Sequence, residues 1–397
     1  MPYNNDKEKL WHPDTQAIRG ALARTEFNET SEILFLNSGY VYQTAEEAED
    51  SFNGNLERYV YSRVANPTVR MFEKRLSMIE GAEDCRATAT GMAAVFGALA
   101  SYLNAGDRLV ASRSLFGSCH YICDQLLPRL GITTELIDGT SQTEWKRALT
   151  KKTNAVFLET PSNPTLEIVD LKMVAELAHS SNAMVFVDNV FATPLLQKPL
   201  EMGADVIIYS ATKHIDGQGR CLGGAVLGNS EYIEEKLTPF IKHTGPSLSP
   251  FNAWVLLKGL ETLSLRVSKQ CNNALEIAEM LSVDPNVEKV IYPELTSHPQ
   301  HGLAMEQMQK GGTIVSFQLI GKKEQAYSFM NKLQLIDISN NLGDTKTLIC
   351  HPATTTHQRL SREEQLEAGI QENLIRLSVG LESLEDLKLD LKNALSR

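Results

Sequence analysis

The sequence lacks long apolar runs and has no excess of positive charge. Its most apolar helix candidate, residues 92–103, is too short to span a bilayer. Residues 1–14 are polar and charged, without the apolar core of a signal peptide. Asp and Glu outnumber Lys and Arg by 49 to 38, giving a net charge of −11 at pH 7, whereas nucleic-acid binding needs clustered cations. We therefore expect a cytoplasmic protein with neither membrane nor nucleic acid among its partners.

Cysteine is sparse, and its spacing is unlike a disulfide framework or a zinc site. The chain has six cysteines and no CxxC pair. They are Cys85, Cys119, Cys123, Cys221, Cys271 and Cys350. We interpret most of them as reduced, half-buried small side chains. The nearest histidine pairs, His298 with His301 and His351 with His357, have no Cys or carboxylate beside them in a ligand pattern, so we expect no metal site.

What the sequence does contain is a regular alternation of apolar strand candidates and helical patterns, from about residue 85 to about residue 230. The strand candidates are residues 85–89, 108–111, 133–137, 155–158, 184–187, 206–209 and 222–227. This alternation is typical of a parallel sheet wound by crossover helices. Ligands in such sheets bind at the carboxyl ends of the strands. We therefore expect the loops that follow these strands to converge on one site.

The length of 397 residues allows about two or three domains. We predict an N-terminal arm at residues 1–65, a large α/β domain at 66–260 and a smaller α+β domain at 261–397. A helical pattern at about residues 248–281 leads into the smaller domain. There, residues 313–319 alternate like a strand and residues 383–395 have the pattern of a closing helix.

Two strand ends offer one amine and one carboxylate. Lys213 follows the strand at 206–209 through small hydroxyl residues, and Asp188 ends the apolar run at 183–187. Pyridoxal phosphate (PLP) needs this pair, because a lysine forms the Schiff base and an Asp keeps the pyridine nitrogen protonated. Taken alone, the two residues also fit a surface lysine and a helix cap.

The run Thr90-Gly91-Met92 is a candidate phosphate site. Glycine lets backbone N–H groups approach an anion closely, and the expected helix at residues 92–103 would place its N-terminus there. Ser210 and Thr212 could donate further hydrogen bonds, although a simple strand-to-helix turn also fits. The rival run at residues 217–223 misses the GxGxxG spacing and does not follow a strand directly, so a nicotinamide enzyme is a weak alternative.

The sequence resembles the PLP-dependent enzymes of cysteine and methionine metabolism, which include cystathionine γ-synthase, cystathionine lyases, methionine γ-lyase and the homoserine-ester sulfhydrylases. The matching runs, in family order, are residues 61–63, 66–68, 90–92, 159–164, 188–194, 210–213, 351–357 and 376–382. They cover nearly the whole chain. The resemblance implies PLP fold type I, with a mostly parallel seven-stranded sheet, helices on both faces and a smaller α+β C-terminal domain.

The resemblance implies a role for each matched residue around the cofactor. Lys213 would form the Schiff base and later move protons, and Asp188 would pair with the pyridine nitrogen. Phe116 would stack on the ring, and Asn163 would contact its hydroxyl oxygen. The phosphate would be held by Gly91, Met92, Ser210 and Thr212.

The resemblance also implies substrate and subunit contacts. Arg376 would clamp the substrate α-carboxylate with its bidentate fork, in preference to a surface ion pair with Glu382. Thr355 would line the substrate pocket. Tyr61 and Arg63, two residues apart in the arm, would reach the phosphate of a neighbouring subunit. We therefore expect a homotetramer built as a dimer of dimers.

Two departures from the family pattern concern the reaction. Many members carry a tyrosine where this chain has Phe116, which stacks but cannot transfer a proton. A leaving group that departs without that acid, such as a carboxylate, is therefore favoured over a thiolate. The second departure is Asn341 in the run at residues 340–343, where relatives commonly show Ser-Leu-Gly at the substrate carboxylate loop.

Both departures resemble the branch of the family that acts on O-succinylhomoserine with sulfide. The implied activity is γ-replacement to homocysteine and succinate, in methionine biosynthesis. Cystathionine γ-synthase, O-acetylhomoserine sulfhydrylase and methionine γ-lyase stay open as alternatives, because no physical argument from the residues separates the acyl groups or sulfide from cysteine. A non-enzymatic PLP-fold protein is a further alternative, but Lys213, Asp188 and Arg376 are all present.

Overall fold

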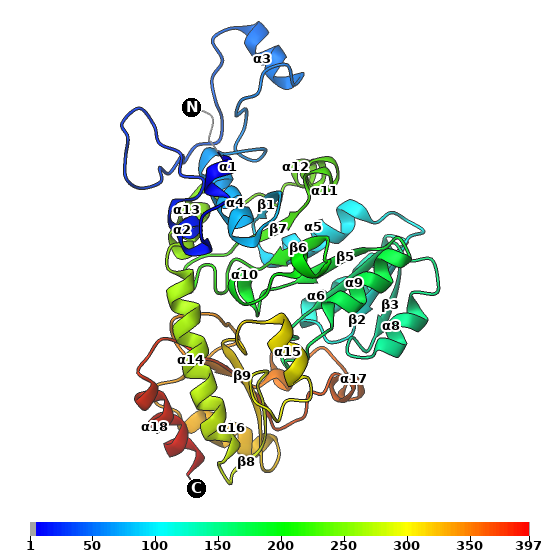
Figure 1. The fold of residues 1–397 in the computed structure, drawn as a ribbon, viewed down its shortest axis with the longest axis vertical. Helices are drawn as coiled ribbons and strands as arrows, with labels where there is room; N and C mark the ends of the chain where they lie inside the picture. The colour runs from blue at the N-terminus through cyan, green and yellow to red at the C-terminus, as the bar shows by residue number, and fades with distance from the viewer. Residues whose placement is uncertain (1–4, 397) are drawn as a thin grey trace.

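The computed structural model describes residues 5–396, and a seven-stranded sheet forms its centre (Figure 1). The strands are β1 (Asp84–Thr88), β2 (Arg108–Ser112), β3 (Thr133–Ile137), β4 (Ala155–Glu159), β5 (Met184–Asp188), β6 (Val206–Tyr209) and β7 (Gly224–Gly228). Their order is β1-β7-β6-β5-β4-β2-β3, and β7 alone runs antiparallel to its two neighbours. The seven strand candidates agree with these bounds to within two residues, and the predicted fold class is confirmed.

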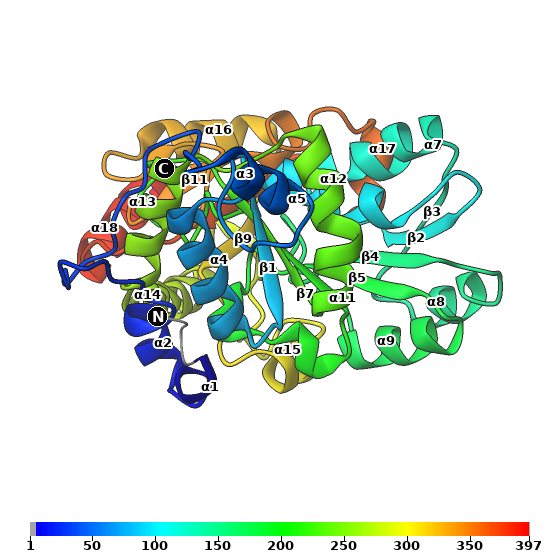
Figure 2. The same cartoon turned by 90° about the horizontal axis from the view of Figure 1, so that it is seen from above.

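Helices cover both faces of this sheet (Figure 2). One face carries α4 (Pro67–Glu80), α8 (Gln142–Ala148), α9 (Leu171–Ser180), α10 (Thr193–Leu196), η2 (Pro199–Met202) and α13 (Pro250–Leu260). The other carries α5 (Gly91–Tyr102), α6 (Gly117–Tyr121), η1 (Ile122–Leu126), α7 (Leu127–Arg129), α11 (Ser230–Tyr232), η3 (Ile233–Leu237) and α12 (Thr238–Thr244). This double covering explains the apolar strands, since β4, β6 and β7 are buried at every position.

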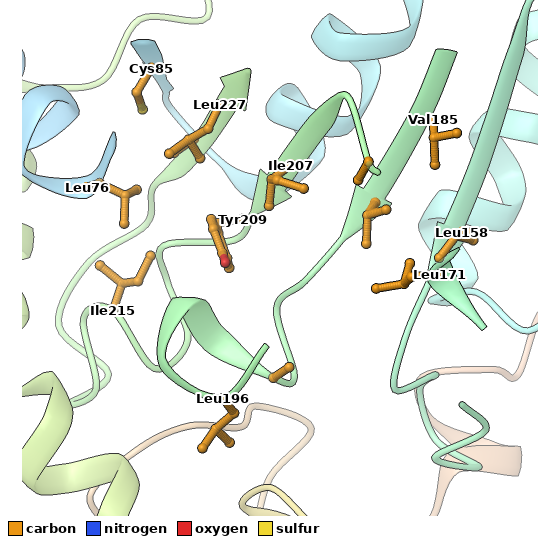
Figure 3. Packing of buried hydrophobic residues seen from close by; sticks show 14 of the residues in the cluster. Leu76, Cys85, Leu158, Leu171, Val185, Leu196, Ile207, Tyr209, Ile215 and Leu227 are labelled. Atoms are coloured by element: carbon orange, nitrogen blue, oxygen red, sulfur yellow. The ribbon is translucent and has the colours of Figure 1, made fainter. Parts of the chain in front are cut away.

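Alternate residues of β6 point to the two opposite cores. Ile207 and Tyr209 pack with Leu76 of α4 in the first core (Figure 3), whereas Ile208 packs in the second. The Tyr209 hydroxyl donates to Glu80 at 2.5 Å and accepts from the Asn189 amide at 2.6 Å. These buried hydrogen bonds tie the end of β6 to the residue after β5, where both strands approach the site.

A second, five-stranded sheet forms the C-terminal part, in the order β10-β11-β12-β9-β8. Its strands are β8 (Val287–Ile291), β9 (Ile314–Leu319), β10 (Asp337–Ile338), β11 (Leu348–Cys350) and β12 (Leu374–Ser378). The accompanying helices are α14 (Leu263–Ser282), α15 (His301–Gln307), α16 (Lys323–Lys332), η4 (Pro352–Thr354), α17 (Arg362–Glu367) and α18 (Leu384–Leu395). The expected strand and closing helix correspond to β9 and α18.

The helical pattern expected at about residues 248–281 is divided into α13 and α14. A continuous helix would use the carbonyl oxygen of Gly259 for the amide of Leu263. Instead, Arg266 donates its Nη2 to that oxygen at 2.8 Å. The Arg266 side chain thus takes over a backbone acceptor at the point where the chain changes direction.

The N-terminal arm contains α1 (Asn5–Glu8), α2 (Pro13–Arg19) and α3 (Ala45–Phe52). The segment with α3 projects from the body of the molecule at the top of Figure 1. It has no buried residue in α3, and it exposes Val41 at 82% and Phe52 at 76%. Within residues 5–396, no helix combines the length and the apolar character that a membrane crossing requires.

Candidate active site

A cavity of about 220 Å³ opens at the carboxyl ends of the parallel strands. Loops that follow β1, β2, β4, β5 and β6 line it, together with residues of the C-terminal part. The convergence of these loops is therefore confirmed. The cavity brings together nine residues singled out from the sequence, namely Gly91, Met92, Phe116, Asn163, Asp188, Ser210, Thr212, Lys213 and Arg376.

The Lys213 amine lies in this cavity, just beyond β6. Its Nζ donates to Asn341 Oδ1 at 2.6 Å. Burial lowers the pKa of Lys213 to about 8, and the positive charge of Arg376 lowers it further. A larger fraction of this amine is thus neutral near pH 7 than for a lysine in water, so the group can act as a nucleophile or base.

Asp188 is the last residue of β5 and faces the same cavity. One carboxylate oxygen accepts from the Val190 amide at 3.1 Å. Burial raises the pKa of Asp188 to about 7. A protonated ring nitrogen beside it would favour the ionised carboxylate, so this position suits a cationic heterocycle.

Backbone amides and hydroxyls form a cradle for an anion at the start of α5. Thr90 caps the helix by accepting from the Ala93 amide at 3.1 Å. The first amides of a helix have no partner within it and attract anions. A Cβ on Gly91 would lie 2.6 Å from the Ser210 Cβ, so only glycine allows this approach. Thr212 lines the same region, and the whole cradle fits a phosphate.

Arg376, on β12, is 1% exposed and bonds to polar groups without a carboxylate partner among the described residues. Its Nη1 donates to Asn163 Oδ1 at 3.0 Å, and its Nη2 donates to the Asn340 carbonyl at 2.8 Å. Its buried Nε has no hydrogen-bond partner within residues 5–396. Glu382 instead accepts from Thr347, so the alternative ion pair is absent from this part of the structure. An anionic group of a ligand would satisfy the guanidinium.

Four predicted residues lie outside the cavity lining. Asn341 contacts the lining through its side-chain oxygen, which accepts from Lys213, and its carbonyl oxygen, which accepts from Arg376 Nη2 at 3.3 Å. The Thr355 hydroxyl donates to the His351 carbonyl at 2.7 Å. Tyr61 is 45% exposed on the arm. Arg63 lies over the Tyr61 ring, 5.5 Å from its centroid. The arm of this chain thus leaves both side chains outside its own site.

The cavity also contains residues to which the sequence analysis gave no role. They are Thr90, Val95, Cys119, Glu159, Val190, Phe191, Ile208, Leu222, Asn340 and Leu342. Glu159 is the last residue of β4, just as Asp188 is the last residue of β5. This shared position at a strand end is visible in the sequence and could have identified Glu159 as a cavity residue. Cys119 is 1% exposed. Its burial and the nearby Asp188 and Glu159 carboxylates raise its pKa well above the ordinary value.

The whole chain is similar to a family described as Cys/Met metabolism PLP-dependent enzymes, whose model matches residues 14–396. It is 54% identical over 386 residues to the O-succinylhomoserine sulfhydrylase of Mycobacterium tuberculosis, covering 96% of this chain and 95% of that one. The O-succinylhomoserine sulfhydrylase of Pseudomonas aeruginosa is 47% identical over 383 residues, with 96% and 95% covered. A Campylobacter jejuni structure that contains N'-pyridoxyl-lysine-5'-monophosphate is 32% identical with a TM-score of 0.93, and 98% of this chain and 100% of that one are covered.

Proposed function

This chain belongs to the Cys/Met metabolism family of PLP-dependent enzymes, and on that basis we propose that it catalyses γ-replacement on O-succinylhomoserine with sulfide. The products would be homocysteine and succinate, as a step of methionine biosynthesis in the cytoplasm. The observation that carries this choice is Phe116 in the cavity, where it can stack but cannot donate a proton. The names of the two sulfhydrylase relatives support the same substrate.

The residues of the cavity fit PLP. Lys213 would bond to the cofactor, Asp188 would pair with its ring nitrogen, and Asn163 would contact its ring hydroxyl oxygen. The phosphate would be held by the amides of Gly91 and Met92 and the hydroxyls of Ser210 and Thr212. Bound there, PLP would supply an electron sink that makes the hydrogen on the substrate Cα acidic.

The protein side chains would then bind the substrate and move its protons. Arg376 would bind the α-carboxylate through its guanidinium, whose Nε lacks a partner within residues 5–396. Lys213, with its lowered pKa, would remove the proton from Cα and relay protons at Cβ. Asn341 would orient the Lys213 amine, as its present hydrogen bond does. The succinate leaves from Cγ without a protein acid, and sulfide takes its place.

Steady-state turnover with matched substrates tests this proposal. Homocysteine formation from O-succinylhomoserine with sulfide should be faster than homocysteine formation from O-acetylhomoserine with sulfide. It should also be faster than cystathionine formation from O-succinylhomoserine with cysteine as nucleophile. Faster reaction of the acetyl ester would identify a different homoserine ester as substrate, and faster reaction with cysteine would identify a cystathionine γ-synthase. A purified protein that takes up no PLP would contradict the cofactor itself.

The Phe116→Tyr variant should gain lyase activity. It places a phenol at the cavity, where a suitably shifted pKa would allow proton transfer to a sulfur leaving group, an effect of about 10²-fold when the geometry is right. Cleavage of cystathionine or methionine, measured as release of 2-oxo acid, should therefore rise. Ester-dependent homocysteine formation should hold or fall. Wild-type enzyme that already cleaves methionine as fast as it uses the ester would refute this explanation of Phe116.

We also propose that the arm completes the site of a neighbouring subunit in a homotetramer, a dimer of dimers. Three observations support this: the arm projects from the body, it exposes large apolar side chains, and it keeps Tyr61 and Arg63 outside the site of its own chain. A second copy would cover this apolar surface. In the same proposal, residues 1–65, 66–260 and 261–397 are the arm and the two domains.

Mixing two inactive variants should restore activity if the arm acts on its neighbour. Arg63→Ala subunits lack the arm contribution, and Lys213→Ala subunits lack the amine. One kind of hybrid site would combine an intact arm with an intact Lys213, so subunit exchange should recover up to about a quarter of wild-type activity for random pairing. Exchange is followed with a size tag on one variant. Proven exchange without recovery would place the arm in the site of its own subunit.

A further inference from the structure

Glu159 is a buried carboxyl of the cavity that the proposed reaction does not use. It ends β4, pairs in register with Asp188 at the end of β5, and lines the cavity beside it. Only 3% of its surface is exposed. Burial raises the pKa of Glu159 well above its ordinary value, and the adjacent Asp188 raises it further. A carboxyl in this position is costly to bury unless hydrogen-bond partners compensate, and Glu159 has two such partners.

The first partner is the loop that carries Phe116. The Phe116 amide donates to Glu159 Oε2 at 2.8 Å. Phe116 itself begins α6 without any side-chain cap. The hydrogen bond to Glu159 therefore ties the aromatic ring, through its own backbone, to the end of a central strand.

The second partner is the turn that carries Asn163. Its backbone N–H faces the same carboxyl and lowers the pKa of Glu159. The side-chain oxygen of Asn163 accepts from Arg376 Nη1 at 3.0 Å. One carboxyl thus connects the loop that would stack on the cofactor with the turn that would contact its ring hydroxyl and the substrate-binding arginine.

We propose that Glu159 is a positioning residue that holds Phe116 and Asn163 in a fixed relation around the cofactor ring. This proposal rests on the proposed function, which places the PLP ring between Phe116 and Asn163. A buried backbone N–H that loses its acceptor costs free energy, so the contact with Glu159 stabilises this arrangement of the loops. A shift of about 1 Å in a supporting group can reduce the rate by about 10²-fold. Glu159 exchanges no proton with the substrate.

The test compares Glu159→Gln and Glu159→Asp holoenzymes with a matched control, Glu167→Gln. Glu167 accepts from the Ser114 hydroxyl at 2.6 Å in the loop that also carries Phe116, and burial raises its pKa too, but it does not line the cavity. Gln keeps the size of Glu159 but presents an NH₂ group to one of the two amides. Asp keeps the carboxyl group but is one methylene too short to reach Phe116.

The readouts are the visible circular dichroism of the bound cofactor, divided by its absorbance, and the Kd for PLP. We expect both Glu159 variants to lower the dichroism ratio and to raise the Kd about tenfold, the effect of losing one buried hydrogen bond. The Glu167→Gln control should match wild type in both readouts. Thermal denaturation midpoints identify any variant whose spectrum changes through unfolding alone. A Phe116→Ala background separates a local change at the cofactor from such unfolding.

In a Phe116→Ala background, the Glu159→Gln change should have a smaller effect on the dichroism than in wild type, because the two residues act together. Fully additive effects would overturn the proposal, as would wild-type spectra and Kd values in both Glu159 variants. A Glu159→Asp enzyme identical to wild type would overturn it as well, since the hydrogen bond to the Phe116 amide would then be dispensable. A wild-type enzyme that binds PLP but does not use O-succinylhomoserine would contradict the proposed function and leave the role of Glu159 standing.

Discussion

Homocysteine formation should fall by about 10⁴-fold or more when Lys213 is replaced by alanine, because the residue would serve both as the attachment point of the cofactor and as the base. The visible absorption of the lysine-bound cofactor should disappear as well. The cavity gives the physical reason, since among residues 5–396 no other lysine lines it. Absorption spectra after dialysis against PLP and steady-state assays provide the measurement.

A surface lysine provides the control for this variant. Lys172 is 59% exposed and pairs with Glu306 across 3.4 Å, far from the cavity lining. Lys172→Ala should keep the spectrum and the turnover of wild type. A Lys213→Ala enzyme that retained more than a few per cent of wild-type turnover would exclude the assigned role.

Arg376→Ala should lower kcat/KM for O-succinylhomoserine by about 10³-fold, because it removes the only guanidinium that the described part of the chain contributes to the cavity lining. Arg376→Lys should recover only part of the loss, since lysine keeps the charge but lacks the bidentate fork. The loss should appear in KM as well as kcat. The PLP spectrum should persist, because the proposed phosphate cradle and Lys213 lie on other loops.

Arg75 offers a matched control for a buried arginine. It is fully buried and pairs with Glu32 at 2.5 Å, outside the cavity. Arg75→Lys should lower the thermal denaturation midpoint and leave KM near its wild-type value. An Arg376→Ala enzyme with unchanged KM and kcat would show that the substrate carboxylate is bound elsewhere.

The strands and the convergence of their loops could be predicted from the sequence because both follow from short-range patterns. Apolar runs of about five residues, each ended by polar residues, specify buried parallel strands, and the geometry of such sheets places their carboxyl ends together. Lys213 and Asp188 could be identified from the sequence in this way, because each lies at or just beyond the end of such a strand. The individual roles of the cavity residues stay predictions, since they concern a bound ligand.

Other features depend on contacts that no local pattern contains. Glu159 meets the Phe116 amide across 43 residues of chain, and Asn341 meets Lys213 across 128. At the break in the long helical pattern, the Gly259 carbonyl accepts from the Arg266 side chain and from the Thr262 amide, contacts that the helical periodicity does not reveal. The arm poses a further difficulty, because a surface that a second copy would cover, as we propose, has the composition of an ordinary loop.

The thiol of Cys119 has a consequence for an enzyme that would handle sulfide. A thiolate at this position would compete with the incoming sulfide for the γ-carbon of the substrate, and the enzyme would alkylate itself. Burial and the neighbouring carboxylates raise the pKa of Cys119 and keep it protonated. Burial first, and the two neighbouring carboxyls second, thus favour the thiol form, so a sulfur atom at this position would be a weak nucleophile beside the proposed substrate.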